Sequence, residues 1–170
     1  MKLSNLVDHI KEKGSFLCVG LDSDIERLPG KFSSKLEALV EFNREIIDAT
    51  KEYCVAYKIN TAFYERYGSA GWKVLEQTRS MLPDTHFLIA DAKRGDIGNT
   101  ANHYAACFFS SMNFDAVTVA PYMGRDSIEP FLGYKDKFAI LLGITSNPGS
   151  ADFQKIQGAD GAYMYEKVIQ

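Results

Sequence analysis

The chain has 170 residues, of which 46% are hydrophobic and 24% are charged, and its formal net charge is −3. That length is enough to bury one core, so we expect a single domain over residues 1–170. The acidic balance gives no electrostatic reason to expect nucleic acid as a partner, and no apolar run approaches the roughly 18 residues that suggest a membrane span.

The amino terminus and the cysteines indicate a cytoplasmic protein. Residues 1–14 mix acidic side chains with lysines and contain no unbroken apolar segment, which is unlike a signal peptide. Cys18, Cys54 and Cys107 are odd in number, widely spaced and set in apolar segments. They are typical of free thiols in a reducing compartment.

Five short apolar runs predict the strands. They are rich in Val, Ile, Leu, Phe and Ala and show little polar alternation until they end. Such runs are typical of strands in a parallel sheet that helices cover. In chain order they occupy residues 16–22, 53–60, 85–93, 114–121 and 137–145.

Helical patterns precede and separate these runs. The first has apolar residues at helical spacing from Leu3 to Ile10 and ends at Gly14. Before the second, Ser34 and Glu37 have the spacing of a capping box, and an apolar face follows.

Three more helices are expected further along the chain. One fills part of residues 63–82, and another begins within residues 160–170. The clearest has an apolar stripe wide enough for the core or for a dimer interface, and we assign most of it to the core. The stripe consists of Ala101, Tyr104, Ala105, Phe108, Phe109 and Met112.

Strand and helix therefore alternate in five βα units, which leaves two α/β architectures. A doubly wound dinucleotide-binding sheet needs a glycine-rich turn after its first strand, and residues 19–24 read Val-Gly-Leu-Asp-Ser-Asp instead. A (β/α)8 TIM barrel has eight units and typically about 250 residues. Because five units alone would leave two open strand edges, we predict the first five units of such a barrel and expect the natural chain to be longer, or this chain to be a fragment.

Polar residues gather where the predicted strands end. Because the carboxyl ends of barrel strands all face one way, these groups are expected to converge at one mouth, where barrel enzymes hold their chemistry. In chain order they are Asp22, Lys58, Asn60, Asp91, Lys93, Asp96, Thr145 and Ser146.

Four of these residues, Lys58, Asp91, Lys93 and Asp96, alternate in charge. A salt-bridged rim would explain one such charge, but four on two neighbouring strands favour a functional site. Asp91 and Lys93 are two apart on a strand, so their side chains should point to the same face. Because a carboxylate and an ammonium hold each other ionised, we expect a permanently charged site.

Such a site suits decarboxylation without a cofactor. A fixed lysine can stabilise a carbanion and then protonate it, while a nearby aspartate repels a substrate carboxylate that must leave. We expect no metal, because His9, His86 and His103 are scattered and lack carboxylates or thiols at ligand spacing.

Residues 91–100, Asp-Ala-Lys-Arg-Gly-Asp-Ile-Gly-Asn-Thr, resemble the D-x-K-x-x-D signature of the orotidine 5′-phosphate decarboxylases, specifically their bacterial-type branch with longer chains. Four further segments, at residues 19–22, 57–60, 120–124 and 145–150, resemble the same branch in the same order. The signature alone is shared with related sugar-phosphate decarboxylases and aldolases, whereas the five segments together are highly specific.

The resemblance implies cofactor-free conversion of orotidine 5′-monophosphate to uridine 5′-monophosphate in de novo pyrimidine biosynthesis. It implies that Lys93 protonates C6 of the pyrimidine and that Asp91 faces the departing carboxylate. Lys58 would belong to the same charged network.

The resemblance also implies how substrate is held. Asp22 and Lys58 would bind the ribose hydroxyls, with Asn60 close by, and Ser146 would contact the pyrimidine edge. In a homodimer, Asp96 and Thr100 would reach across the interface into the partner's site.

The chain departs from the family where the phosphate binds. Family members use a glutamine from a mobile loop and an arginine from a late strand end, and neither has a counterpart before Gln170. Because remote phosphate binding contributes free energy at the reacting centre, a chain that ended here should lose most of its catalysis.

Two alternatives stay open. A Mg²⁺-dependent sugar-phosphate decarboxylase or aldolase of the same superfamily would place a carboxylate near the end of the second strand, where this chain has Lys58. A non-catalytic barrel fragment that only binds nucleotide or dimerises is the other alternative.

Overall fold

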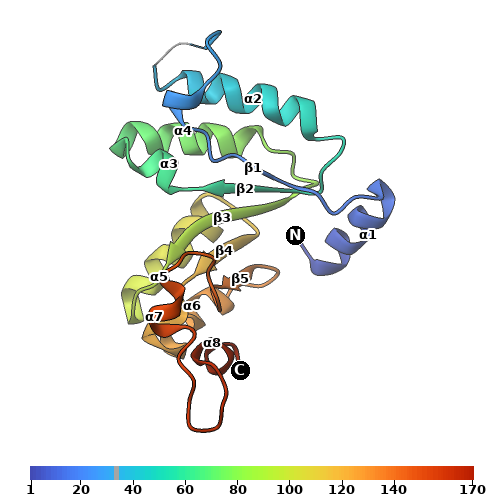
Figure 1. Cartoon of the computed structure of the whole chain (residues 1–170). Helices are drawn as coiled ribbons and strands as arrows, with labels where there is room; N and C mark the ends of the chain where they lie inside the picture. Colours follow the sequence, from blue (N-terminus) through green and yellow to red (C-terminus); the bar gives the residue numbers. More distant parts are fainter. Residues whose placement is uncertain (33–34) are drawn as a thin grey trace.

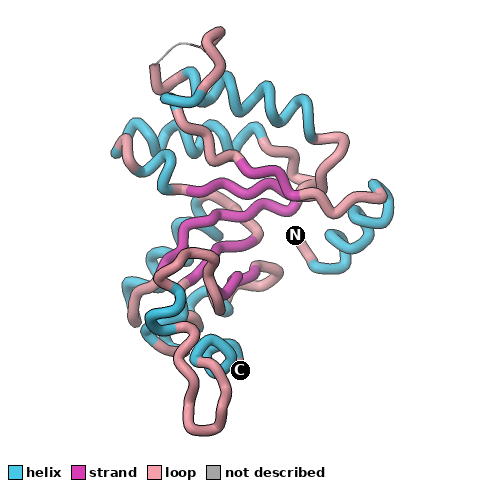
Figure 2. Tube along the Cα trace, in the orientation of Figure 1, coloured by secondary structure: helices cyan, strands magenta, loops and turns pink. Residues whose placement is uncertain are grey.

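The computed structural model describes residues 1–32 and 35–170. Its framework is a parallel sheet of five strands in which each strand pairs with the next one in the sequence. The direction of the strands turns progressively across the sheet, as the twist of parallel strands requires (Figure 2). All five predicted runs form strands, namely β1 (Cys18–Gly20), β2 (Ala56–Asn60), β3 (Phe87–Arg94), β4 (Ala116–Val119) and β5 (Phe138–Leu141).

Helices follow the strands along the chain, as the predicted βα repeat requires. Near β1 and β2, α2 and α4 run along one side of the sheet, while α1 lies at the amino ends of the strands (Figure 1). The α-helices are α1 (Leu3–Lys13), α2 (Ala38–Thr50), α3 (Ala62–Glu65), α4 (Gly68–Met81), α5 (Gly98–Ala106), α6 (Glu129–Leu132), α7 (Ser150–Phe153) and α8 (Met164–Ile169). Short helical turns of other types occupy Ile25–Arg27, Cys107–Ser111, Pro121–Met123 and Arg125–Ser127.

The two faces of the sheet pack against different partners, because successive strand residues point to opposite sides. One set joins the helices in the main core, and it includes Tyr57, Ile59, Leu88, Ala90, Val117 and Val119. The alternate set forms a smaller cluster with α1, and it includes Ala56, Phe87 and Ala116 with Leu6 and Ile10 of that helix. By the same alternation, Lys58 and Asp91 lie on the face of the sheet that carries Ala56 and Phe87, which we call the inner face.

The first two predicted helices form, although one of their expected caps cannot be placed. Gly14 ends α1 with φ of 59°, a left-handed conformation that glycine adopts at little cost. The second helix begins at Ala38 after Glu37, whose side chain makes no capping hydrogen bond. Ser34, the other half of the expected capping box, lies outside the described residues.

The region 63–82 contains the expected helix as α4, preceded by the short α3. The chain changes direction between them at Gly68, which has φ of 58°. A Cβ atom at Gly71 would lie 1.8 Å from the carbonyl oxygen of Tyr64, so only glycine permits this close approach of the two helices.

The apolar stripe of the fourth predicted helix serves the core. Ala101 and Ala105 of α5 are fully buried, and the chain continues as a π-helical turn over Cys107–Ser111. Phe108 and Phe109 on that turn are at most 3% exposed, so they are not available to a dimer interface. Across the two described stretches, no helix is both long and apolar enough to cross a membrane.

Candidate active site

Asp91 is the centre of a charged network, on the same face of the sheet as the smaller apolar cluster that packs against α1. Its Oδ2 atom lies 3.3 Å from Nζ of Lys58, and its Oδ1 atom lies 2.7 Å from Nζ of Lys93. Oδ1 also accepts a hydrogen bond of 2.8 Å from the hydroxyl of Thr118. The side chain of Asp91 is 10% exposed, whereas that of Lys93 is 51% exposed. A largely buried carboxylate therefore holds a lysine that is accessible to solvent.

The predicted pairing of Asp91 with Lys93 is present, but the strand that carries them is not regular. The pairing between β3 and β4 shifts between Ala90 and Arg94, and Lys93 has φ of 47°. A left-handed conformation at a residue other than glycine costs about 1–3 kcal/mol, and such conformations cluster at functional sites. Strand alternation alone therefore does not account for the geometry of the pair.

The pKa of Asp91 results from opposing influences. Burial raises it, but the hydrogen bonds from Lys93 and Thr118 and the charges of Lys58 and Lys93 together outweigh burial, so the pKa is lowered from its ordinary value. The carboxylate is therefore ionised at neutral pH, as the sequence predicts.

Asp22 extends the network towards β1. Nζ of Lys58 lies 3.2 Å from both carboxylate oxygens of Asp22, and the backbone N–H of Asn60 donates to Oδ1 of Asp22 at 3.1 Å. The side chain of Asn60 is directed into local structure, because its Oδ1 accepts from the N–H of Ala62 at the start of α3, at 3.2 Å. Asp22 and Lys58 are about one-third exposed, so both are open to a ligand.

The structure leaves three predicted site residues outside this network. Oδ1 of Asp96 accepts from the N–H of Ile97 at 2.8 Å, and no ion pair links Asp96 to another residue in the described part of the chain. Thr100 is exposed in the first turn of α5, and Ser146 is exposed in the loop after β5. The roles assigned to these three residues stay predictions.

Two residues that the sequence did not single out hold the end of β3. Thr118 lies between Val117 and Val119 in the fully buried β4, and this single polar side chain in an apolar strand was the available signal. On the other side, Arg94 forms an ion pair with Glu65 and lies over the rings of Tyr104 and Phe108, with centroid distances of 5.2 and 5.4 Å.

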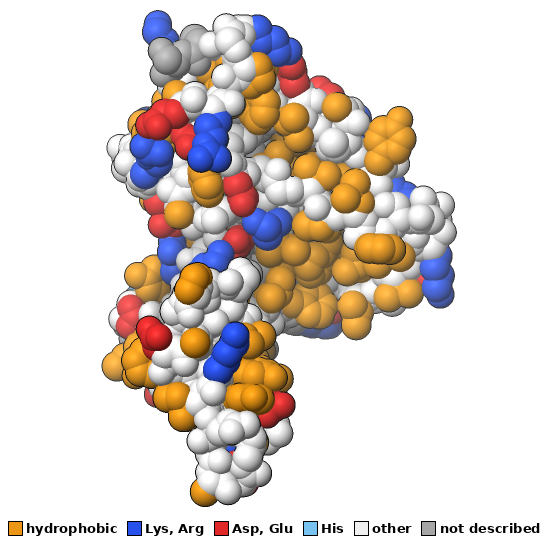
Figure 3. Space-filling view, in the orientation of Figure 1, with side chains coloured by type: hydrophobic (Ala, Val, Ile, Leu, Met, Phe, Trp, Pro, Cys, Tyr) orange, Lys and Arg blue, Asp and Glu red, His pale blue; other side chains and the backbone are white. Residues whose placement is uncertain are grey.

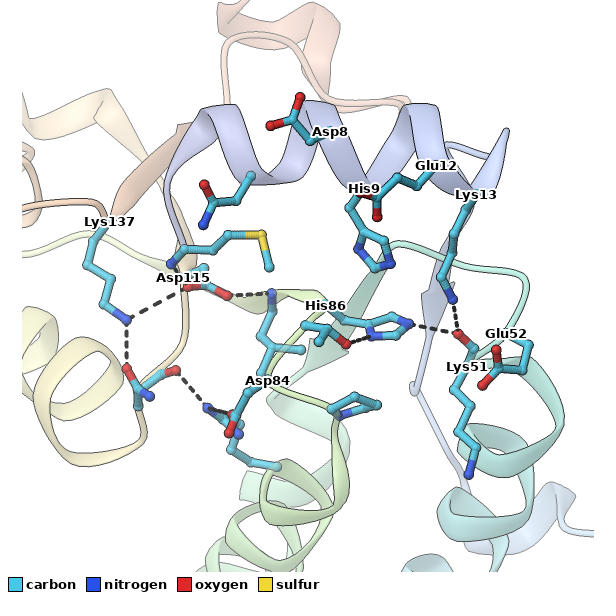
Figure 4. A pocket seen from close by; sticks show the side chains of 17 residues that line it. Asp8, His9, Glu12, Lys13, Lys51, Glu52, Asp84, His86, Asp115 and Lys137 are labelled. Carbon is cyan, nitrogen blue, oxygen red and sulfur yellow. Dashed lines mark hydrogen bonds and ion pairs between the residues drawn. The ribbon is translucent and has the colours of Figure 1, made fainter.

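The opposite end of the strands holds a second polar region. A hollow of about 880 Å³ lies there beneath α1, with His9 and His86 on one side and Asp115 and Lys137 on the other (Figure 4). His86 precedes β3 and Lys93 is near its end, so this hollow is separate from the charged network. In the described ranges, no three His, Cys, Asp or Glu side chains come together as a metal site requires.

Charged and apolar surface lie next to each other on one face of the molecule. In the view of Figure 3, acidic and basic side chains gather beside a recessed band of hydrophobic side chains. Ile140, Leu141 and Ile144, in and after β5, are at least 36% exposed, so apolar surface continues to the edge of the sheet. These features define a βα-barrel protein with a lysine–aspartate–lysine site at the carboxyl ends of its strands.

Comparison with known proteins identifies the family. Residues 15–169 match the model of the Orotidine 5′-phosphate decarboxylase / HUMPS family, and the chain belongs to that family. An orotidine 5′-phosphate decarboxylase of Porphyromonas gingivalis is 53% identical over 174 residues, which cover all of this chain and 63% of the relative.

Solved structures agree with this assignment. The structure of Leishmania donovani OMP decarboxylase has a TM-score of 0.87 and 40% identity, and the match covers 99% of this chain and 63% of that one. A structure from Toxoplasma gondii has a TM-score of 0.91 and 37% identity, over 98% of this chain and 56% of that one. The predicted TIM-barrel fold, of which five units are present, is confirmed, and the chain spans less than two-thirds of the length of these relatives.

Proposed function

We propose that this chain carries the charged half of the active site of an orotidine 5′-monophosphate decarboxylase, a cytoplasmic enzyme of de novo pyrimidine biosynthesis that needs no cofactor. The observation that carries the proposal is the position of Asp91 between Lys58 and Lys93, at 3.3 and 2.7 Å. Family membership and relatives that bear this name at about 50% identity support the choice of reaction.

In the proposed reaction the bond between C6 of the pyrimidine and the carboxylate carbon breaks, and carbon dioxide leaves. The electron pair stays on C6, where the ammonium of Lys93 stabilises the developing negative charge. A proton then moves from Nζ of Lys93 to C6, and solvent restores the proton to the lysine. The ionised Asp91 repels the substrate carboxylate and holds the ammonium beside it, which favours departure of carbon dioxide.

The same proposal assigns the binding groups. Asp22 and Lys58 hold the ribose hydroxyls, and their partial exposure supports this assignment. Asn60 lies next to them in the sequence of β2, and Ser146 contacts the pyrimidine edge. In a homodimer, Asp96 and Thr100 approach the partner's site, which agrees with their freedom from the network in their own chain.

We assign binding of the substrate phosphate to groups in the part of the relatives that this chain does not match. TIM barrels commonly bind phosphate with the loops of their seventh and eighth units. This chain matches 63% of the relative from Porphyromonas gingivalis, so the remaining part of such proteins is the natural source of those groups.

Turnover of orotidine monophosphate, followed as loss of substrate absorbance, tests the proposal. The 170-residue chain is compared with Lys93→Ala and with Lys73→Ala, a matched control that removes an exposed lysine of α4. We expect Lys93→Ala to abolish turnover and Lys73→Ala to leave it unchanged. Equal and measurable turnover in all three proteins would contradict Lys93 as the proton donor, whereas no turnover in the unmodified chain would make the missing phosphate-binding units the first thing to restore.

The alternatives give different results. Binding of uridine monophosphate in calorimetry without turnover would favour a fragment that only binds nucleotide. If EDTA abolishes the enzyme activity and Mg²⁺ recovers it, the result would favour the metal-dependent sugar-phosphate branch of the family.

A further inference from the structure

The pairing between β3 and β4 contains an interruption at the charged network. Ala90 pairs with Val117 and Arg94 pairs with Val119, so four steps along β3 correspond to two steps along β4. The residues that bulge out are those between Ala90 and Arg94, which include Asp91 and Lys93. A bulge of this kind redirects side chains and leaves backbone groups without their ladder partners.

The hydroxyl of Thr118 occupies the gap that the bulge creates. It accepts a hydrogen bond of 2.9 Å from the backbone N–H of Lys93 and lies 2.8 Å from Oδ1 of Asp91. Because the backbone group can only donate, the single hydroxyl proton of Thr118 is directed at the carboxylate. Thr118 is 7% exposed, so water has little access to replace either bond.

We infer that Thr118 is a positioning residue of the charged site: its two hydrogen bonds fix the carboxylate of Asp91 and the left-handed backbone of Lys93 relative to each other. The consequence is that the ammonium of Lys93 is held at 2.7 Å from Asp91 while half of its side chain stays exposed. The catalytic meaning of this inference rests on the proposed function, but the two hydrogen bonds can be tested without it.

The bulge has a second anchor besides Thr118. Nη1 of Arg94 donates to the carbonyl oxygen of Ala92 at 3.1 Å, and the same guanidinium pairs with Glu65. We expect these contacts to hold the bulge when the hydroxyl of Thr118 is removed. Thr118→Val keeps the branched shape that strands favour and removes only the hydroxyl, so the variant is expected to fold.

The experiment compares the 170-residue chain with Thr118→Val and Thr118→Ser by NMR. In Thr118→Val, the pKa of Asp91 should rise, because the carboxylate loses a donor, and the amide of Lys93 should exchange faster with solvent, because it loses its acceptor. Thr118→Ser keeps the hydroxyl and should restore both properties. In protein that turns over orotidine monophosphate, Thr118→Val should lower kcat by about 10- to 100-fold with a smaller change in KM, and Thr118→Ser should recover most of the rate.

Each result decides between a positioning role and a packing role. An unchanged Asp91 pKa and unchanged Lys93 exchange in Thr118→Val would overturn the inference, as would losses that Thr118→Ser fails to restore. Absence of turnover in the unmodified chain would point to the phosphate-binding groups that it lacks, and the NMR result would then decide the role of Thr118 without the proposed function.

Discussion

Two carboxylates lie at opposite ends of the strands. At the carboxyl ends, Asp91 accepts hydrogen bonds from the side chains of Lys58, Lys93 and Thr118. At the amino ends, Asp115 connects β3 with the amino terminus of the chain. Oδ2 of Asp115 accepts from the backbone N–H of Leu88 at 3.0 Å, and Oδ1 pairs with the amino group of Met1.

Both carboxylates are nearly buried and both have lysine neighbours, since Lys137 lies 4.0 Å from Asp115. A buried carboxylate with a lysine is therefore not by itself a functional site. The distinguishing features are a half-exposed lysine, a strained backbone and a place at the carboxyl ends of parallel strands.

The largest expected effect follows from removing the charge at the carboxyl end. Asp91→Asn keeps the size of the side chain but removes the negative charge that is the counter-ion of two lysines and that, in the proposed mechanism, repels the substrate carboxylate. We expect turnover of orotidine monophosphate to fall by about 100- to 1,000-fold, which is the scale seen when one preorganised electrostatic group is lost. Steady-state kinetics measure the loss. A rate within threefold of the unmodified chain, a difference on the order of 0.6 kcal/mol in activation free energy, would contradict a functional role for the charge of Asp91.

The matched substitution at the amino end should affect stability and not turnover. Asp115→Asn weakens the bonds that tie Met1 and Lys137 to the start of β3. We expect the free energy of unfolding to decrease by about 1–3 kcal/mol, as for loss of charge-assisted hydrogen bonds in a buried place. Urea unfolding measures the change, and the rate per folded molecule should stay the same. A large fall in kcat with unchanged stability would show that the two ends are not separate in function.

The sequence predicted most of the carboxyl end because its signals are local. Lys58, Asp91 and Lys93 stand at the ends of apolar runs, and parallel strands bring such ends together whatever the details of packing. Thr118 could not be recognised in the same way, because threonine is an ordinary strand former and its value here depends on a bulge in the neighbouring strand.

The amino end was harder to predict, and so were the loops. Asp115 immediately precedes β4 and looks like a solvated strand terminus until α1 is seen to cover it. Asp96 lies only three residues beyond Lys93, yet its carboxylate accepts from the N–H of Ile97 and forms no ion pair with the network among the described residues. Spacing along a strand does not extend past the point where the strand ends.

A smaller, pH-dependent effect on stability should distinguish the amino ends of the strands, where His86 lies, from the carboxyl ends. His86 is 3% exposed, and its Nε2 and Nδ1 atoms lie 2.9 Å from the carbonyl oxygen of Lys51 and 3.1 Å from the hydroxyl of Thr85. Burial lowers its pKa from the ordinary value of 6.5, with Lys13 and His9 adding to the shift and the hydrogen bond to Lys51 opposing it.

Because the folded protein binds this proton less readily than the unfolded chain, the stability that neutral His86 contributes is fully present above pH 6.5. It is lost as the pH falls from there through the lower pKa of the folded state. Asp91 has a lowered pKa from an ordinary value of 3.8, so its own contribution is lost only at more acidic pH. Urea unfolding at pH 7.5 and 5.5 should therefore show a decrease that His86→Gln reduces and that His103→Gln, at an exposed position of α5, leaves intact. The same decrease in all three proteins would assign the pH dependence elsewhere and remove the amino end as its source.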